Sequence, residues 1–307
     1  MRSRRRAGGL FQRAIAESGS YDTTQATLAA AEASGRDFAA KAGCAEQTAA
    51  CLRRLPVATI LADEATEYRP NIDTEVLPRS VGDAFRSGRF QHVPIVNGTN
   101  RDEWRLMVAA GTLAGRPVTA ANYQAMISSA LGVSPAQAAV IAAEYPSTAY
   151  PSPALALGAV GTDAVFACPA LSIDRSASRY VPTFAYEFDD ENAPQDFLPS
   201  ASFPYGAAHA TELQYLFGLP EAAYPHSLSA PQQRLAAVMR GYWTDFAKRG
   251  APTASGAPAW RPFTSGAQRV QSFVPPTAHT ETDVATTHDC AFWASQQARQ
   301  DAPAGAR

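Results

Sequence analysis

The sequence predicts an α/β protein with a mainly parallel sheet, and three observations lead to this prediction. Short apolar segments typical of buried strands alternate with longer segments that have helical periodicity. The composition is globular, with 46% hydrophobic and 18% charged residues. The length of 307 residues is enough for a large core in one or two domains.

Three segments are predicted to be strands. Residues 11–17 form a short run that ends at the polar Ser18-Gly-Ser20. Residues 93–97 are apolar and bounded by Gly98, and Pro94 is expected near the start of that strand or at an irregularity. Residues 182–188 alternate most clearly, which places Phe184, Tyr186 and Phe188 on one face.

The helices are predicted from periodicity and from their capping residues. Helices are expected over 27–42, 121–131 and 135–145, and one or two more over 154–179. The longest is expected over 229–249, where Ser229 and Gln232 have capping-box spacing and Gly250 follows the last turn. Its apolar face is interpreted as core packing and consists of Leu235, Val238, Met239, Tyr242 and Phe246.

Charge and hydropathy exclude several classes of protein. The net charge of -2 gives no basic surface for nucleic acid, and no run of 18 apolar residues predicts a membrane span. The basic start leads into no apolar segment with a cleavage site, so it is not interpreted as a signal peptide. Residues 1–8 are predicted to be a basic N-terminal arm, and residues 296–307 a disordered tail.

Four cysteines occur, at Cys44, Cys51, Cys168 and Cys290. An even number is compatible with two disulfides in an oxidising compartment, with three possible pairings. It is equally compatible with four reduced, buried cysteines. His288-Asp289-Cys290 alone is a weak metal signal, and no metal or cofactor is predicted.

Two polar segments carry the candidate chemistry. Glu103 ends the segment Gly98-Thr-Asn-Arg-Asp-Glu103 after a predicted strand and a Gly-Thr-Asn turn, and His209 follows 106 residues later in Gly206-Ala-Ala-His209. Each residue is expected on a loop at a sheet edge, where functional groups gather. A base with an acid that orients it is what a serine ester hydrolase needs. The remaining histidines have no comparable setting, at His92, His226, His279 and His288.

Five motifs resemble those of the type B carboxylesterases and occur in the same order along the chain as in that family. The family includes the cholinesterases and secreted fungal lipases. Residues 9–20 are similar to the stretch G-L-F-x-R-A-I-x-x-S-G-S, and residues 93–103 to a strand that ends in G-x-N-x-D-E. Residues 206–218 match G-x-x-H-x-x-E-L-x-x-x-F-G. Two further stretches resemble the family's motifs. W-x-x-F-A-x-x-G-x-P begins at Trp243, and C-x-F-W begins at Cys290.

This resemblance implies that residues 9–295 are the C-terminal part of an α/β-hydrolase fold. It implies Glu103 as triad acid and His209 as triad base, with Ser18 and Glu212 as buried polar supports. It further implies the disulfides Cys44–Cys51 and Cys168–Cys290, a secreted or extracytoplasmic protein, and a small carboxylic ester as substrate.

The chain also departs from the family pattern. No G-x-S-x-G nucleophile elbow occurs in the 307 residues, and Ser18 and Ser20, the nearest candidates, lack glycines on both sides. The elbow, the oxyanion hole and the first strands are therefore expected to be missing, with a separate N-terminal fragment as a possible partner. The chain alone is predicted to be inactive and poorly soluble. Trp104 replaces a usually small residue beside Glu103.

Two other functions are considered. The first is a non-catalytic remnant or binding module, because some members of this superfamily serve adhesion. The intact Glu103, His209 and Glu212 favour the ester hydrolase instead. The second is a glycosidase with paired carboxylates, but Asp189-Asp190-Glu191 is interpreted as a solvated loop.

Overall fold

The computed structural model describes residues 8–20, 23–63 and 69–301. The described residues divide into two compact units. One comprises the segment up to Leu10 together with the residues from 23 to Gln91, and the other comprises the segment 11–20 together with the residues from His92 onward. The predicted arm falls almost entirely outside the described residues.

The first unit is helical. The Thr27 side chain accepts a hydrogen bond from the Ala30 N–H and starts α2, as the sequence predicts. The disulfide Cys44–Cys51 closes the connection that follows α2. The helices of this unit are α2 (Leu28–Lys41), α3 (Ala49–Leu52), α4 (Val57–Asp63) and α5 (Val81–Arg86).

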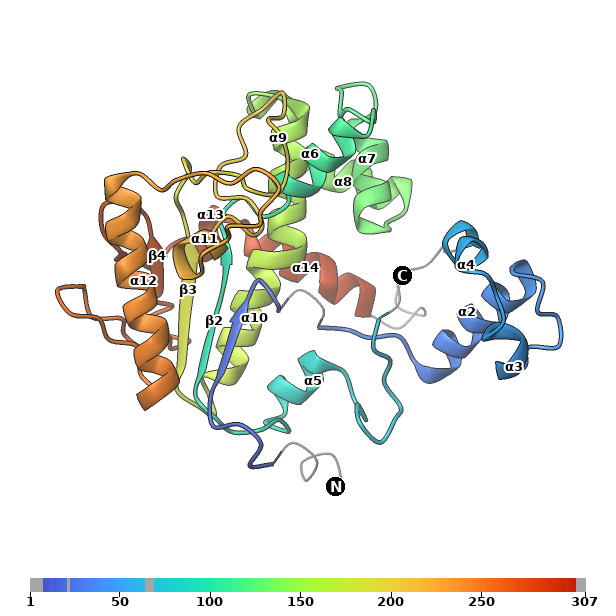
Figure 1. Ribbon diagram of the computed structural model, residues 1–307, viewed down its shortest axis with the longest axis horizontal. Helices are drawn as coiled ribbons and strands as arrows, with labels where there is room; N and C mark the ends of the chain where they lie inside the picture. Colours follow the sequence, from blue (N-terminus) through green and yellow to red (C-terminus); the bar gives the residue numbers. More distant parts are fainter. Residues whose placement is uncertain (1–7, 21–22, 64–68, 302–307) are drawn as a thin grey trace. The chain divides into compact units, whose positions relative to one another are not determined.

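The second unit is built on a mixed sheet of five strands with helices on its faces, consistent with the predicted α/β class (Figure 1). The strands lie in the order of the chain. The first four are parallel to their neighbours, and the last pair is antiparallel. They are β1 (Ala14–Glu17), β2 (Ile95–Asn100), β3 (Thr183–Phe188), β4 (Val270–Phe273) and β5 (His279–Glu281).

Strand β2 runs further than the sequence predicts, and the expected Gly-Thr-Asn turn is part of it. Gly98 pairs with Tyr186 of β3, and a Cβ atom at Gly98 would lie only 2.3 Å from the Tyr186 Cδ1 atom. The glycine therefore permits close packing inside the sheet instead of ending the strand. Pro94 lies directly before β2, as expected.

The two faces of the sheet are covered by different helices. Phe184, Tyr186 and Phe188 face the apolar side of α12 (Ala230–Arg249), and they share one core with it. Ala185 points to the opposite face and packs with Leu171 of α10 (Cys168–Ala177). Figure 1 shows α12 and α10 on opposite sides of β3 and β2. The capping box of Ser229 and Gln232 at the start of α12 is present.

A second core of this unit lies among four helices. Ser134 and Gln137 exchange hydrogen bonds in a capping box at the start of α8, within the helix that the sequence predicts over 135–145. Ile127, Ile141 and Val160 are buried in this core. The segments involved are α6 (Arg105–Leu113), α7 (Tyr123–Leu131), α8 (Pro135–Glu144) and α9 (Pro153–Gly161), with a short 3-10 helix, η1 (Ser147–Ala149).

One long apolar helical segment links this core to the sheet. It consists of α9, the π-helix η2 (Thr162–Ala167) and α10, without a break. Taken together, Pro153–Ala177 is long and apolar enough to cross a membrane by length and composition, with a mean hydropathy of 1.6. However, 78% of its most apolar window is buried inside the protein, which is how the core helix of a globular fold looks.

The C-terminal part is tied to the middle of the chain. The disulfide Cys168–Cys290 joins the start of α10 to the start of α14 (Cys290–Asp301), which follows α13 (Val284–Thr287). The helix α14 continues to Asp301 and so includes the first residues of the tail that the sequence predicts from residue 296. Its alanines and glutamines favour a helix even where they are exposed. Residues 302–307 lie outside the described residues.

Candidate active site

Glu103 is a fully buried carboxylate that follows the carboxyl end of β2. Its side chain has 0% exposure. One oxygen, Oε1, accepts hydrogen bonds from the Asn100 N–H, at 2.7 Å, and from the Ser18 hydroxyl. The other oxygen, Oε2, lies 2.6 Å from Nδ1 of His209. Ligand sites in parallel sheets lie at this end of the strands.

The loop before His209 is held against the turn that carries Glu103. Ala207 exchanges two hydrogen bonds with Asp102, each 3.0 Å long, through its own N–H and its own carbonyl oxygen. The His209 N–H donates to the Glu103 carbonyl oxygen at 3.2 Å. Gly206 has a φ of +64° and lies so close to Asp102 that a Cβ atom would clash with its carboxylate. The backbone thus places the imidazole beside the Glu103 carboxylate.

The His209 ring has the surroundings of a general base. The hydrogen bond to the Glu103 carboxylate raises the pKa of His209 above its ordinary value, against the opposing effect of burial. The carboxylate on Nδ1 favours the tautomer with Nδ1 protonated, so Nε2 is available as the basic atom. The His209 side chain is 34% exposed, and among the described residues Nε2 has no hydrogen-bond partner. The Phe166 ring lies 5.3 Å away between ring centroids.

Ser18 lies at the end of β1, where its hydroxyl serves Glu103. Its N–H donates to the Gly98 carbonyl oxygen at 2.9 Å, which continues the β1–β2 pairing. The residue is buried and has a φ of +52°, in the left-handed region. Because its hydroxyl donates to the Glu103 carboxylate, it is engaged away from His209. Ser20 instead donates to Asn97 at 2.6 Å.

Glu212 is a second buried carboxylate, three residues after His209 and just before α11 (Leu213–Leu216). Its partner is the Asn100 side chain, which donates to Glu212 and also to the Ala208 carbonyl oxygen at 2.8 Å. Burial raises the pKa of Glu212 to about 7, and the nearby Glu103 carboxylate adds to this rise. Asn100 thus links Glu212 to the loop of His209. The sequence analysis did not single it out, although its place in the strand motif could have done so.

Trp104 packs without displacing Glu103. A Cβ atom at Gly161 would lie 2.1 Å from the Trp104 Cγ atom, so the indole occupies the space that this glycine leaves open. The indole also contacts Phe166, with 6.1 Å between ring centroids. The Trp104 N–H donates to the Thr162 hydroxyl at 3.0 Å. Trp104 and Phe166 therefore form one aromatic layer behind His209.

Three further histidines contact carboxylates, contrary to the expectation that none has a comparable setting. His279 Nε2 lies 2.8 Å from the nearby Glu281, and the other two pair with carboxylates far along the chain. His226 Nδ1 lies 2.9 Å from Asp196. His288 is buried between Asp163, at 2.5 Å from Nδ1, and Glu187, at 2.7 Å from Nε2. His288 uses both ring nitrogens and has none left for chemistry. No sequence signal pointed to either pair, because the partners lie far apart along the chain.

The acidic run after β3 also differs from its interpretation as a solvated loop. Asp190 is buried and accepts hydrogen bonds from the Tyr215 hydroxyl at 2.5 Å and from Gln232 Nε2 at 2.9 Å. Asp189 is mostly buried and lies 2.8 Å from Arg101. Only Glu191 is exposed. Within the described residues, no group of three or more His, Cys, Asp or Glu side chains could hold a metal ion.

The comparison with family models agrees with the motif order. Residues 1–293 match the model of the carboxylesterase family. The chain belongs to the carboxylesterase family. The motifs and the Glu103–His209 pair described above therefore belong to a member of this family.

Individual carboxylesterase relatives are distant in sequence. An acylcarnitine hydrolase of Rattus norvegicus is 27% identical over 82% of this chain and 47% of its own length. Carboxylesterase 3 of Pongo abelii is 26% identical over 86% of this chain and 50% of its own length. Neuroligin-2 of Homo sapiens is 27% identical over 80% of this chain and 32% of its own length. The chain thus spans about half the length of the first two relatives, and less of the third.

Proposed function

We propose that this chain carries the acid and the base of a carboxylic-ester hydrolase, with Glu103 as the acid and His209 as the base. The observation that supports this most directly is the hydrogen bond from Nδ1 of a partly exposed His209 to the fully buried Glu103 carboxylate. The pair lies beyond the carboxyl ends of β1 and β2. Family membership supports ester hydrolysis as the class of reaction.

The proposed mechanism is acyl transfer through a serine outside these 307 residues. His209 Nε2 takes the proton of the serine hydroxyl as the oxygen attacks the ester carbonyl. Glu103 holds the tautomer with Nδ1 protonated and stabilises the imidazolium that forms. His209 then gives the proton to the leaving alcohol, and water releases the acid in a second step with His209 again as base. Ser18 and Glu212 are positioning residues, since they touch Glu103 and Asn100 and not the substrate.

The second candidate is a non-catalytic binding module. The observation that favours it is that no G-x-S-x-G motif occurs in these 307 residues. The retained base argues against it, because binding alone needs no His209 with its Nε2 left open. We also propose an extracytoplasmic location, since disulfides such as Cys44–Cys51 and Cys168–Cys290 persist in oxidising compartments.

A fluorophosphonate probe applied to the native protein from its source tests the proposal. Such probes label a serine that is activated by a neighbouring base. We expect one labelled serine, in a segment that precedes these 307 residues or in a separate chain, and an intact mass or a copurifying chain that accounts for it. Labelling is expected to disappear in His209→Ala. A native mass of 32.6 kDa with no labelled serine and no second chain would favour the binding module.

Labelling of the isolated chain distinguishes the parts of the proposal. The 307-residue chain alone is expected to remain unlabelled and to leave 4-nitrophenyl acetate intact. If it hydrolyses this ester and loses that activity in His209→Ala, the base is supported but the nucleophile lies within the chain. The serine that the probe marks would then be identified by peptide mapping.

A further inference from the structure

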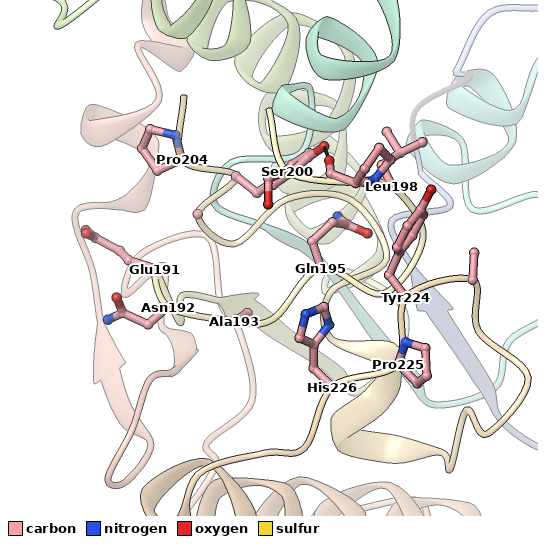
Figure 2. A pocket seen from close by; sticks show the side chains of 14 residues that line it. Glu191, Asn192, Ala193, Gln195, Leu198, Ser200, Pro204, Tyr224, Pro225 and His226 are labelled. Carbon is pink, nitrogen blue, oxygen red and sulfur yellow. Dashed lines mark hydrogen bonds between the residues drawn. The ribbon is translucent and has the colours of Figure 1, made fainter. Parts of the chain in front are cut away.

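A cavity whose lining does not include Glu103 or His209 lies beside the loop that follows β3. Its volume is about 740 Å³, within the usual range of roughly 300–1,000 Å³ for small-molecule sites. One wall is formed by residues between Glu191 and Gly206, and the other by Ala223–His226 (Figure 2). Tyr224 and Leu198 supply apolar surface in this lining.

One side chain in the wall is a buried donor without a partner. Gln195 has only 8% exposure, and its Oε1 accepts a hydrogen bond from the Phe197 N–H at 2.8 Å. That bond fixes the orientation of the amide, because an NH₂ group could not face an N–H donor. The Nε2 group is buried and, among the described residues, has no hydrogen-bond partner. Figure 2 shows the Gln195 side chain among Leu198, Tyr224 and His226. A buried unpaired donor is costly, so a ligand acceptor at this point would remove the cost.

The walls of the cavity are held in place before any ligand enters. Asp196 accepts hydrogen bonds from the N–H and Nδ1 of His226, at 3.1 and 2.9 Å, and its carbonyl oxygen accepts from the Tyr224 N–H at 2.9 Å. The Tyr205 hydroxyl donates to the Pro199 carbonyl oxygen at 2.6 Å. Preorganised walls lower the entropy cost of binding.

The charges around the cavity select against ions. Glu191 is the acidic residue of the lining, and the buried Asp196 lies behind the lining against His226, so a ligand anion would meet a carboxylate and no unpaired cation among the described lining residues. Glu191 is already paired with Arg101, and Asp196 with His226, so a ligand cation would find no unpaired carboxylate there. The unpaired donor, by contrast, is a neutral amide. The chemistry of the wall fits an uncharged acceptor.

We propose that this cavity is a ligand site for uncharged, planar molecules that carry a carbonyl oxygen, with Gln195 Nε2 as its donor. The carbonyl accepts from Gln195, and the planar body lies against Tyr224 and Leu198. This site goes beyond the ester hydrolysis proposed above, since it uses neither Glu103 nor His209. Binding can therefore be measured whether or not the chain is an esterase.

Three ligands of nearly equal shape and different charge test the site. Benzamide is neutral with a carbonyl acceptor, benzoate is an anion, and benzamidine is a cation with donors only. Saturation-transfer NMR on the 307-residue chain, titrated with each compound, gives the three dissociation constants. Benzamide is expected to bind with a dissociation constant on the order of 1 mM, and the other two at least about fivefold more weakly.

Two variants assign the binding to Gln195. Gln195→Leu removes the donor and is expected to weaken benzamide about fivefold. Gln195→Glu keeps the acceptor for the Phe197 N–H but replaces the donor by a carboxylate oxygen, so benzamidine should become the preferred ligand. Gln124→Glu, which makes the same change at an exposed amide on α7, should bind as the unaltered chain does.

The same titrations can overturn the proposal. Equal affinity for all three compounds, no benzamide binding, or unchanged affinity in Gln195→Leu would each rule out Gln195 as the donor of a ligand site. If circular dichroism shows that Gln195→Leu does not fold, the test depends on Gln195→Glu alone. That variant is expected to bind benzamidine more tightly than benzamide. Without that reversal the proposal is wrong.

Discussion

At the scale of single residues, the Glu103 carboxylate shows how a charge is kept inside this protein. A buried carboxylate without partners would be strongly destabilising. Glu103 has three partners from three parts of the chain: the Ser18 hydroxyl, the Asn100 N–H and the His209 ring. Loss of any one leaves an acceptor less well satisfied. Ser18 is the partner that can be removed without touching the backbone.

The Ser18 hydroxyl is therefore predicted to stabilise the fold. Ser18→Ala should lower the free energy of unfolding by about 2 kcal/mol, because a hydrogen bond to a buried charged group is lost. Ser18→Gly loses the same bond but accepts the φ of +52° more easily, so its loss should be about 1 kcal/mol smaller. Urea unfolding of both variants measures the difference. Equal losses would mean that backbone strain at Ser18 contributes nothing.

His288 is predicted to make stability depend on pH. Burial alone would lower its pKa, but the Glu187 and Asp163 carboxylates outweigh burial and raise the pKa well above its ordinary value. A raised folded-state pKa means that this stabilisation is complete below the unfolded pKa of about 6.5 and is lost as pH rises through the folded value. Removing the cation in His288→Gln should cost about 3–5 kcal/mol near pH 6.

Thermal unfolding at several pH values tests this assignment. The other charged groups near the site stay in place in the variant, namely Asp289 and Asp189, and so does the Tyr145 hydroxyl that donates to Asp163. The difference in unfolding temperature between the unaltered chain and His288→Gln should therefore become smaller as pH rises. A difference that stays constant from pH 6 to pH 10 would show that the imidazole contributes through its shape and not through its charge. His279→Gln, at an exposed ion pair, is the control.

At the scale of elements, the packing of the junction between α9 and η2 against the turn before α6 depends on Gly161, the last residue of α9. Its missing Cβ leaves the space that the Trp104 indole fills. Gly161→Ala should cost about 1–3 kcal/mol by overpacking. Trp104→Ala in the same chain should recover part of that loss, because the clash disappears. Gly111→Ala on α6, where the nearest atom is 3.9 Å away, should instead be neutral or stabilising by up to about 1 kcal/mol. Chemical unfolding of the four proteins measures these effects.

The elements that the sequence predicted well are those with local signals. Ser229 with Gln232 was recognised as a helix start from its spacing, and that capping box is present. The helix over 135–145 was also predicted, and it begins with a capping box of Ser134 and Gln137. Strand β4 was missed because its buried residues include Gln271 and therefore give no apolar run. The end of β2 was misplaced because Gly98 was interpreted as a turn signal. Its actual role depends on Tyr186 in another strand, which no local pattern reveals.

The same distinction applies to the candidate site. Glu103 and His209 were predicted from motifs, and the structure brings them into contact. The pairs His226–Asp196 and His288–Asp163 are 30 and 125 residues apart in the chain and belong to no motif, so only the fold could reveal them. The Gln195 donor was also unforeseen, since its lack of a partner is a property of its packing.

At the scale of the whole molecule, the two disulfides should contribute unequally. Cys168–Cys290 spans a sequence separation of 122, and Cys44–Cys51 a separation of 7. Loop-closure entropy predicts about 5 kcal/mol for the long bridge and about 2.5 kcal/mol for the short one. The bridges lie in different compact units. Cys168→Ala with Cys290→Ala should thus lower the main thermal transition more than Cys44→Ala with Cys51→Ala. The reverse order would mean that the bridges do not stabilise the protein mainly by restricting the unfolded chain.

The exposed edge of the sheet is predicted to govern the solubility of the isolated chain. Within the described residues β1 pairs with β2 alone, so its other side offers unpaired backbone groups. Ile15 on this strand is 37% exposed. A lysine at a strand edge opposes pairing with another chain, so Ile15→Lys should reduce self-association measured by light scattering. Val57→Lys, at a 70% exposed valine in α4, removes more exposed apolar surface but lies on no strand. If both variants reduce association equally, general hydrophobicity and not the edge of β1 is responsible.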